Sequence, residues 1–241
     1  MCVESELNID KFIFVCGLHR SGTTIIENYI HSVFDVSVLR ADVPENEGQH
    51  LQDVYPPAKK FGGPGKFAFA QQMHPKEPTD SEASKCKNRL LECWMPHICG
   101  NETTLCEKSP PNLTKIKWLR KVFPNSMFII VTRDPRAVAS ATIKWSKTSL
   151  ESLVFHWHVA YSSAIESMSH DCVIIRYEDF CLNPFEVIEN SGICSFVNKR
   201  KNTLDVDERF GIIINNNEYY ISEHESMYYG CGAWDHFGYV L

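Results

Sequence analysis

Apolar residues along the chain gather in short runs, separated by longer stretches whose apolar positions recur at helical spacing. The short runs are typical of buried strands, and they are Lys11–Cys16, Val36–Leu39, Leu105–Lys108, Met127–Thr132 and Cys172–Arg176. The stretches between them predict helices at Ile25–Phe34, Asp80–Trp94, Asn112–Val122, from Pro135, at Leu150–Ser167 and at Pro184–Val197. Strands that alternate with helices predict an α/β fold of three layers, in which helices flank both faces of a central, mostly parallel sheet.

The length of 241 residues suits a single domain that spans the whole chain, 1–241. Within it, residues 42–100 stand apart, because they begin with a long stretch rich in Pro and Gly. So long a loop inside a compact domain usually serves function, so we expect 42–100 to be a loop and helix insertion that helps to form a binding site. After Asn198 the pattern weakens and predicts only a short strand near Ile212–Ile214.

Composition narrows the class of protein. Hydrophobic residues make up 44% and charged residues 22% of the chain, as in soluble globular proteins. The longest apolar runs fall far short of the ~20 residues that a membrane span requires. The ten cysteines include no Cys-x-x-Cys pair, and the acidic N-terminus resembles no signal peptide. These features predict reduced thiols in a cytoplasmic protein without a metal site or a membrane anchor.

Charge is distributed unevenly. The net charge of −6 argues against nucleic acids and anionic membranes as partners. Between Glu107 and Ser149, however, nine basic residues face only two acidic ones. This local excess of positive charge is compatible with a compact anionic ligand, although not with a polyanion.

The loop Gly17–Thr24 follows the first predicted strand and precedes the first predicted helix. Such a loop places backbone N–H groups and a helix N-terminus around an anion. It resembles the nucleotide-binding pattern G-x-x-x-x-G-K-[ST], but Thr23 stands where that pattern needs Lys, and the cation of the loop is Arg20. A P-loop-like unit with an anion cradle that does not require a metal is therefore predicted.

A second anion-binding residue is predicted at the end of Met127–Thr132. In a P-loop NTPase, the corresponding Mg²⁺-binding strand (Walker B) would end directly in Asp, whereas here Arg133 comes before Asp134. An arginine at this place offers a bidentate grip on a phosphate. Together with the glycine loop, it suggests a ligand that carries two separated anionic groups.

Four segments, in order along the chain, carry a resemblance to one family. Gly17–Thr24 resembles the 5′-phosphosulfate loop of the sulfotransferases that use 3′-phosphoadenosine 5′-phosphosulfate (PAPS), and Thr132–Ser140 resembles their 3′-phosphate motif. Glu107–Pro110 and Ile175–Phe180, the latter followed by Asn183-Pro184, are similar to two further segments of the family. The resemblance covers about residues 11–197 and is closest to the bacterial-type and tyrosylprotein branch.

This resemblance implies in-line transfer of a sulfuryl group to a hydroxyl or amine, without a metal and with adenosine 3′,5′-bisphosphate (PAP) as the product. It assigns Arg20 and Lys108 to the stabilisation of charge on the transferring and leaving oxygens. The segment Pro44–Gln49 resembles the part of the family that supplies the general base, and Glu47 aligns best with that carboxylate. Glu45, His19 and His50 are alternatives for this role.

The residues expected to bind PAPS come from the loop and from three later segments. They are His19, Arg20, Ser21, Gly22, Thr23, Thr24, Arg133, Ser140 and Tyr177. One departure concerns the 3′-phosphate motif, because the family usually places its Ser eight residues after the Arg, where this chain has Ala141. Ser140, one residue earlier, is the candidate in its place.

Two other functions remain open at this point. One is a P-loop small-molecule kinase or NTPase, which the missing loop Lys disfavours, and the other is a catalytically inactive nucleotide-binding protein. For a sulfotransferase, we expect a small-molecule acceptor rather than a protein, bound between residues 42–100 and the C-terminal tail. The acceptor itself and the oligomeric state cannot be predicted from the sequence.

Overall fold

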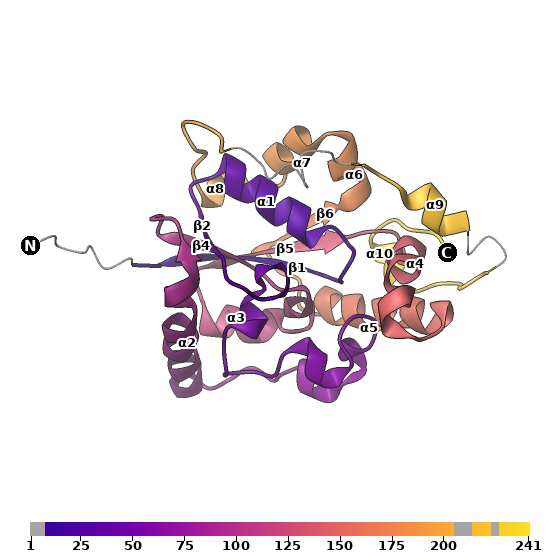
Figure 1. Cartoon of the computed structure of the whole chain (residues 1–241), viewed down its shortest axis with the longest axis horizontal. Helices are drawn as coiled ribbons and strands as arrows, with labels where there is room; N and C mark the ends of the chain where they lie inside the picture. Colours follow the sequence, from indigo (N-terminus) through magenta and orange to yellow (C-terminus); the bar gives the residue numbers. More distant parts are fainter. Residues whose placement is uncertain (1–7, 205–213, 223–226) are drawn as a thin grey trace, which may run out of the picture.

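The computed structural model describes residues 8–204, 214–222 and 227–241. Its centre is a six-stranded sheet with the order β3-β2-β4-β1-β5-β6, which Figure 1 shows nearly edge-on. The strands are β1 (Lys11–Gly17), β2 (Ser37–Leu39), β3 (Ile98–Cys99), β4 (Thr104–Lys108), β5 (Ser126–Thr132) and β6 (Cys172–Arg176). All neighbours pair in parallel except β3, which is antiparallel to β2.

Helices cover both faces of this sheet, which confirms the predicted α/β fold with three layers. On one face lie α1 (Thr23–Val33), α6 (Tyr177–Leu182), α7 (Pro184–Asn190) and α8 (Ile193–Phe196). The other face carries α2 (Asp80–Trp94), α3 (Ile116–Val122), α4 (Pro135–Ser146), α5 (Leu150–Ile165) and α10 (Ala233–His236). No helix in the part of the chain that the structure describes is both long and apolar enough to cross a bilayer.

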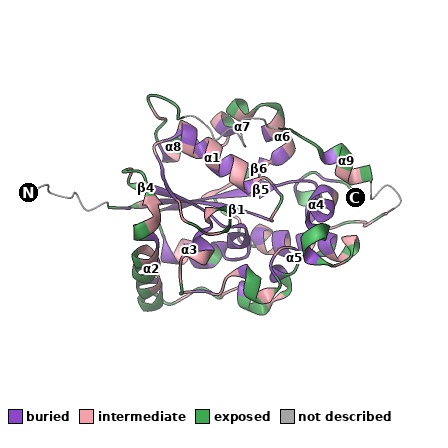
Figure 2. Ribbon diagram, in the orientation of Figure 1, coloured by how far each residue is buried: buried purple, intermediate pink, exposed green. Residues whose placement is uncertain are grey.

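The two cores follow from the alternation of side chains along the buried strands. Phe12 and Phe14 of β1 point into the core beneath α3 and α5, whereas Ile13 and Val15 point towards α1. Both sets are apolar because the centre of a parallel sheet is buried on both faces, and Figure 2 shows the central strands β1, β4 and β5 buried and the outer helix faces exposed.

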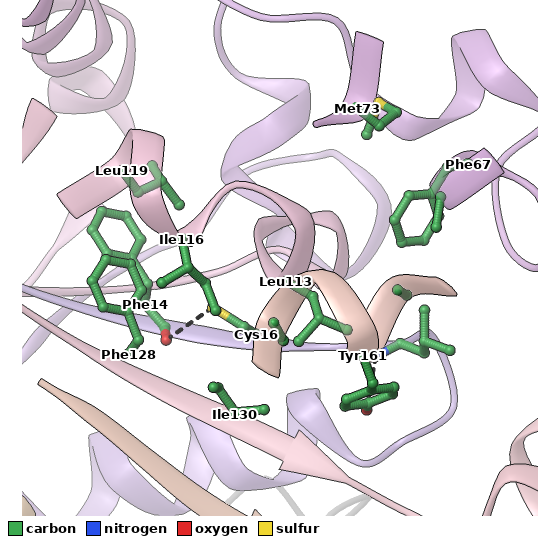
Figure 3. Packing of buried hydrophobic residues seen from close by; sticks show 14 of the residues in the cluster. Phe14, Cys16, Phe67, Met73, Leu113, Ile116, Leu119, Phe128, Ile130 and Tyr161 are labelled. Carbon is green, nitrogen blue, oxygen red and sulfur yellow. Dashed lines mark hydrogen bonds between the residues drawn. The ribbon is translucent and has the colours of Figure 1, made fainter. Parts of the chain in front are cut away.

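Residues 40–80 are not a featureless loop. They form short 3₁₀ turns, at Pro44–Asn46, Gly48–His50, Ala58–Phe61, Phe67–Phe69 and Gln71–Met73. Phe67 and Met73 are fully buried and belong to the same core cluster as Leu113 and Tyr161, as the close view in Figure 3 illustrates. Packing of these side chains fixes the loop against the domain.

Two predicted helices differ from the structure. Asn112–Val122 is not one helix, because a 3₁₀ turn at Pro110–Thr114 precedes α3 and Lys115 between them has non-helical backbone angles. Pro184–Val197 is divided into α7 and α8, since Gly192 stands at the break with a φ of 85°. The positive φ of Gly192 is the local cause of the second break.

Several short elements were not predicted at all. They are α6, which follows β6 directly, the two-residue strand β3, α9 (Asn217–Ile221) and α10. The strand predicted near Ile212–Ile214 lies mostly outside the described residues, and Ile214 itself is in no regular element.

Candidate active site

The loop between β1 and α1 is a tight turn that places the N-terminus of α1 at the surface of a cleft. Ser21 closes the turn, because its backbone N–H and its hydroxyl both donate to the carbonyl oxygen of Leu18, at 3.0 and 2.7 Å. Gly22 comes just before α1 with a φ of 100°, and a Cβ there would lie 2.4 Å from the ring of Tyr177. Only glycine therefore fits this position.

The cleft beside this turn has a volume of about 460 Å³. It brings together parts of the chain that are far apart in sequence: it is lined by His19, Arg20, Gly22, Thr23, Thr24, Ile25, Glu45, Glu47, Pro110, Arg133, Trp145 and Tyr177. Most of the residues predicted to bind PAPS or to act in catalysis are in this set. Ser21, Lys108 and Ser140 are not, and all three are buried.

Glu47 and Lys108 lie together at one end of the cleft. Lys108 Nζ is 3.5 Å from Glu47 Oε1 and donates to the carbonyl oxygen of Glu45 at 2.8 Å. Gln49 Nε2 donates to the other carboxylate oxygen of Glu47, and His50 Nε2 is 3.7 Å from that oxygen. Glu47 is buried, whereas Glu45 is exposed and contacts Lys108 only through its backbone.

A buried carboxylate of the Glu107–Pro110 segment, to which the sequence assigned no role of its own, fixes this end of the cleft. Glu107, at the end of β4, accepts hydrogen bonds from the Gly48 N–H at 3.0 Å, from the Ser109 hydroxyl and from the Asn112 amide. Burial raises the pKa of Glu107 to about 7. Because it holds Gly48, Glu107 positions the neighbouring Glu47.

His19 lies between the cleft and the core. The centre of its ring lies 5.8 Å from the centre of the Phe67 ring, in an edge-on arrangement. Its Nδ1 atom is buried without a hydrogen-bond partner among the described residues. Burial lowers the pKa of His19 to about 4, so the imidazole is neutral near pH 7. Burial also lowers the pKa of His50.

Arg133 lies at the opposite end, directly after β5. Its guanidinium is almost fully buried, yet it lines the cleft. It donates from Nε to Asn217 Oδ1 at 2.8 Å, from one terminal nitrogen to the Arg20 carbonyl at 3.0 Å, and from the other to Asn216 Oδ1 at 2.8 Å. It also lies 4.7 Å from the centre of the Tyr177 ring.

The other predicted ligands at this end contact the protein's C-terminal part. The Ser140 hydroxyl donates to the carbonyl of Tyr220 at 3.1 Å, and the Tyr177 hydroxyl donates to the carbonyl of Ile214 at 2.9 Å. Asn216, Asn217 and Tyr220 were not predicted, because they follow the segment in which the sequence pattern fades. Their polar and aromatic character alone did not distinguish them from a surface loop.

The rim of the cleft is formed by Arg20 and Trp145. The Arg20 guanidinium lies 4.9 Å from the centre of the Trp145 ring, and both side chains are exposed. Cations therefore stand at the rim (Arg20), at the end near Glu47 (Lys108) and at the far end (Arg133). Such an arrangement suits a ligand with two anionic groups that reacts beside a carboxylate.

The sequence is similar to those of known sulfotransferases. A profile described as the sulfotransferase family matches residues 13–198. Protein-tyrosine sulfotransferase 1 of Danio rerio is 26% identical over an alignment of 186 residues that covers 71% of this chain and 49% of that protein. The chain thus spans about half the length of this relative.

Solved structures share the fold. The sulfotransferase domain of the Synechococcus PCC 7002 olefin synthase superposes with a TM-score of 0.56 over 98% of both chains, at 14% identity. A sulfotransferase from Alicyclobacillus acidocaldarius gives 0.51, at 13% identity, over 85% of this chain and 86% of its own. At these identities the likeness confirms the P-loop-like fold.

Proposed function

Because the chain belongs to the sulfotransferase family, we propose that it transfers a sulfuryl group from PAPS to a hydroxyl or amine, by in-line displacement and without a metal. The observation that carries this proposal is the convergence of Arg20, Glu47 and Arg133, from three distant segments, on one cleft. This reaction needs a cation in the loop, a carboxylate and a second cation, which here is buried.

The two ends of the cleft fit the two anionic ends of the donor. The N-terminus of α1, an eleven-residue helix without a side-chain cap, presents backbone N–H groups beside Arg20, Thr23 and Thr24. These groups would hold the 5′-phosphosulfate, because a helix N-terminus favours anions. Arg133 at the other end would hold the 3′-phosphate.

The chemistry assigned to this chain is the movement of one proton and the stabilisation of charge. Bound PAPS would supply the sulfuryl group, whose bond to the 5′-phosphate breaks as its bond to the acceptor forms. Glu47 would accept the proton of the attacking hydroxyl or amine, since it is the buried carboxylate that lines the cleft. Lys108, 3.5 Å from Glu47, and Arg20 would stabilise negative charge on the transferring and leaving oxygens.

A kinase or NTPase function is less well supported. Asp134, the carboxylate that follows β5 in sequence, accepts from the backbone N–H of Arg136 at 2.9 Å and pairs with its guanidinium at 2.8 Å. It therefore caps α4 instead of presenting a free carboxylate for Mg²⁺. Thr23 occupies the position of the lysine that reaches nucleotide phosphates.

For the acceptor we propose a small molecule, which Glu45, Pro110 and Ile25 would contact beside Glu47. The name of the Danio rerio relative specifies a protein tyrosine, so tyrosine peptides belong in any acceptor screen. A cytoplasmic location remains a prediction from the sequence.

The test is a transfer assay with radiolabelled PAPS in EDTA, against a panel of alcohols, phenols, amines, glycans and tyrosine peptides. The proposal expects label in at least one acceptor and equimolar release of the bisphosphate. Bisphosphate binding without transfer to any member of the panel would favour an inactive nucleotide-binding protein. Binding of Mg·ATP without binding of the bisphosphate would overturn the proposal.

A further inference from the structure

Residues 214–222, here called the clamp segment, contain α9 and connect three elements of the cleft. The segment contacts Arg133 after β5, Ser140 of α4 and Tyr177 of α6. These are the three residues assigned to the nucleotide outside the glycine loop. Figure 1 shows α9 near α4, beyond the ends of β5 and β6.

The hydrogen bonds of Arg133 define how its guanidinium is oriented. An arginine has five N–H donors, and Arg133 uses three of them, one on each nitrogen. One N–H on each terminal nitrogen is left without an acceptor among the described residues. A buried guanidinium that lines a cleft and keeps one unused N–H on each terminal nitrogen has two donors with which to bind an anion.

Asn217 is the residue that fixes this orientation. It is buried, and its amide bridges two charged groups: Oδ1 accepts from Arg133 Nε at 2.8 Å, while Nδ2 donates to Glu178 Oε1 at 2.5 Å. The bridge determines the amide orientation, because the reverse placement would oppose two donors and two acceptors. Asn217 thus joins Arg133 to a fixed carboxylate.

Glu178 is itself held in place by groups outside the clamp segment. It accepts from the backbone N–H of Asp134 at 2.9 Å and from the hydroxyl of Tyr239 at 2.8 Å. Because α4 and the C-terminal tail anchor Glu178 independently, the Arg133–Asn217–Glu178 chain has one rigid end. Loss of the Asn217 amide would leave Glu178 anchored and would remove the acceptor of Arg133 Nε, so that only the bonds to Asn216 and to the Arg20 carbonyl would orient the guanidinium.

Building on the proposed function, we propose that Asn217 is a positioning residue for the 3′-phosphate of the donor. It holds the Arg133 guanidinium so that its two remaining N–H groups face the cleft, and Asn216 supports the same orientation from the exposed side. The clamp segment therefore determines the preference for a 3′-phosphorylated nucleotide, although it is remote in sequence from every motif of the cleft.

The test compares the binding of adenosine 3′,5′-bisphosphate and adenosine 5′-monophosphate by calorimetry. We expect the wild type to prefer the bisphosphate, and Asn217→Ala to weaken bisphosphate binding roughly tenfold, as for a lost bond to a charged group, while monophosphate affinity changes less than twofold. In the transfer assay the same variant should raise the KM for PAPS and leave kcat nearly unchanged. Asn190→Ala, an exposed asparagine of α7, is the matched control and should change neither affinity.

Two results would overturn this inference alone: no change in bisphosphate affinity, or an equal loss for both nucleotides, which indicates a merely structural role. A wild type that binds both nucleotides equally would overturn the proposed donor as well. Asn216→Ala provides a second variant at an exposed position that tolerates substitution. It should give a smaller loss that is again confined to the bisphosphate, and a loss shared by both nucleotides would contradict the proposal.

Discussion

Two anion-binding parts of the cleft, the glycine loop and Arg133, are built by different means. At the glycine loop, the groups are backbone N–H groups and an exposed Arg20, all within a few residues of one turn. At the far end, a buried Arg133 is oriented by Asn216 and Asn217, more than eighty residues away in sequence. The first end is built locally and the second by tertiary contacts, so the two ends should respond differently to substitution.

The largest effect is expected at the proposed general base, Glu47. Glu47→Ala should lower turnover roughly 10²–10⁴-fold, the usual contribution of general base catalysis, and should change bisphosphate affinity less than twofold. Asp42→Ala is the matched control, because this carboxylate of the same segment is exposed and is not among the residues that line the cleft. Retained turnover in the first variant, or its loss in the second, would assign the base elsewhere.

The next largest effects are expected from the two arginines of the cleft, Arg133 and Arg20, and should differ in kind. Arg133→Gln should weaken bisphosphate binding by about 2–3 kcal/mol, since a charged hydrogen-bonding group is removed, with little change for the monophosphate. Arg20→Gln should affect turnover more than bisphosphate affinity, because Arg20 would act on the transferring group. Calorimetry with both nucleotides and steady-state kinetics measure the two patterns, and identical patterns for both variants would contradict the division into two ends.

The glycine loop depends on the backbone conformation of Gly22. Gly22→Ala should destabilise the protein by about 1–3 kcal/mol, since the new Cβ would stand at positive φ and clash with the Tyr177 ring. Gly192→Ala is the control, because Gly192 also has a positive φ but no atom within 4 Å of a Cβ. Thermal unfolding should show a smaller loss for the control, and equal losses would mean that the Tyr177 contact is unimportant.

The smallest effect concerns His19 and pH. Burial lowers the pKa of His19 to about 4 from an ordinary 6.5, so between these values the unfolded chain binds more protons than the folded one. Stability therefore rises with pH from about 4 to 6.5 and is constant above that range with respect to this group. His19→Gln should reduce this rise by about 1–2 kcal/mol, measured by denaturant unfolding at pH 4.5 and 7.

His156 provides a background of the same sign in that experiment, because burial lowers its pKa to about 3. The comparison must therefore be made between variant and wild type at each pH. An unchanged pH dependence in His19→Gln would mean that His19 is accessible to solvent in the folded protein.

Much of the fold was predictable because parallel strands and their helices are local patterns. β1, β5 and β6 and the helices α1 and α2 appear close to where the spacing of apolar residues predicts them. The division into α7 and α8 was missed because apolar spacing continues across Gly192. Short elements such as β3 are set by pairing with β2, which no local pattern reveals.

In the candidate site, too, some residues follow from local sequence patterns and others depend on tertiary contacts. The glycine loop and Arg133 stand directly after apolar runs, so their position at strand ends followed from the sequence. The contacts of Glu107 with Gly48, and of Asn217 with Arg133 and Glu178, join segments far apart along the chain. They depend on tertiary packing, and a single sequence contains no signal that pairs them.

The proposed function requires the cleft to accept a nucleotide with two separated anionic groups and no metal. Calorimetric titration of the wild type with adenosine 3′,5′-bisphosphate in EDTA tests it most directly, with the 5′-monophosphate and Mg·ATP as comparisons. We expect one site per chain that binds the bisphosphate at least tenfold more tightly than the monophosphate, since the monophosphate lacks a phosphate contact of about 1.4 kcal/mol or more. Binding of Mg·ATP alone, or equal affinity for all three nucleotides, would contradict it.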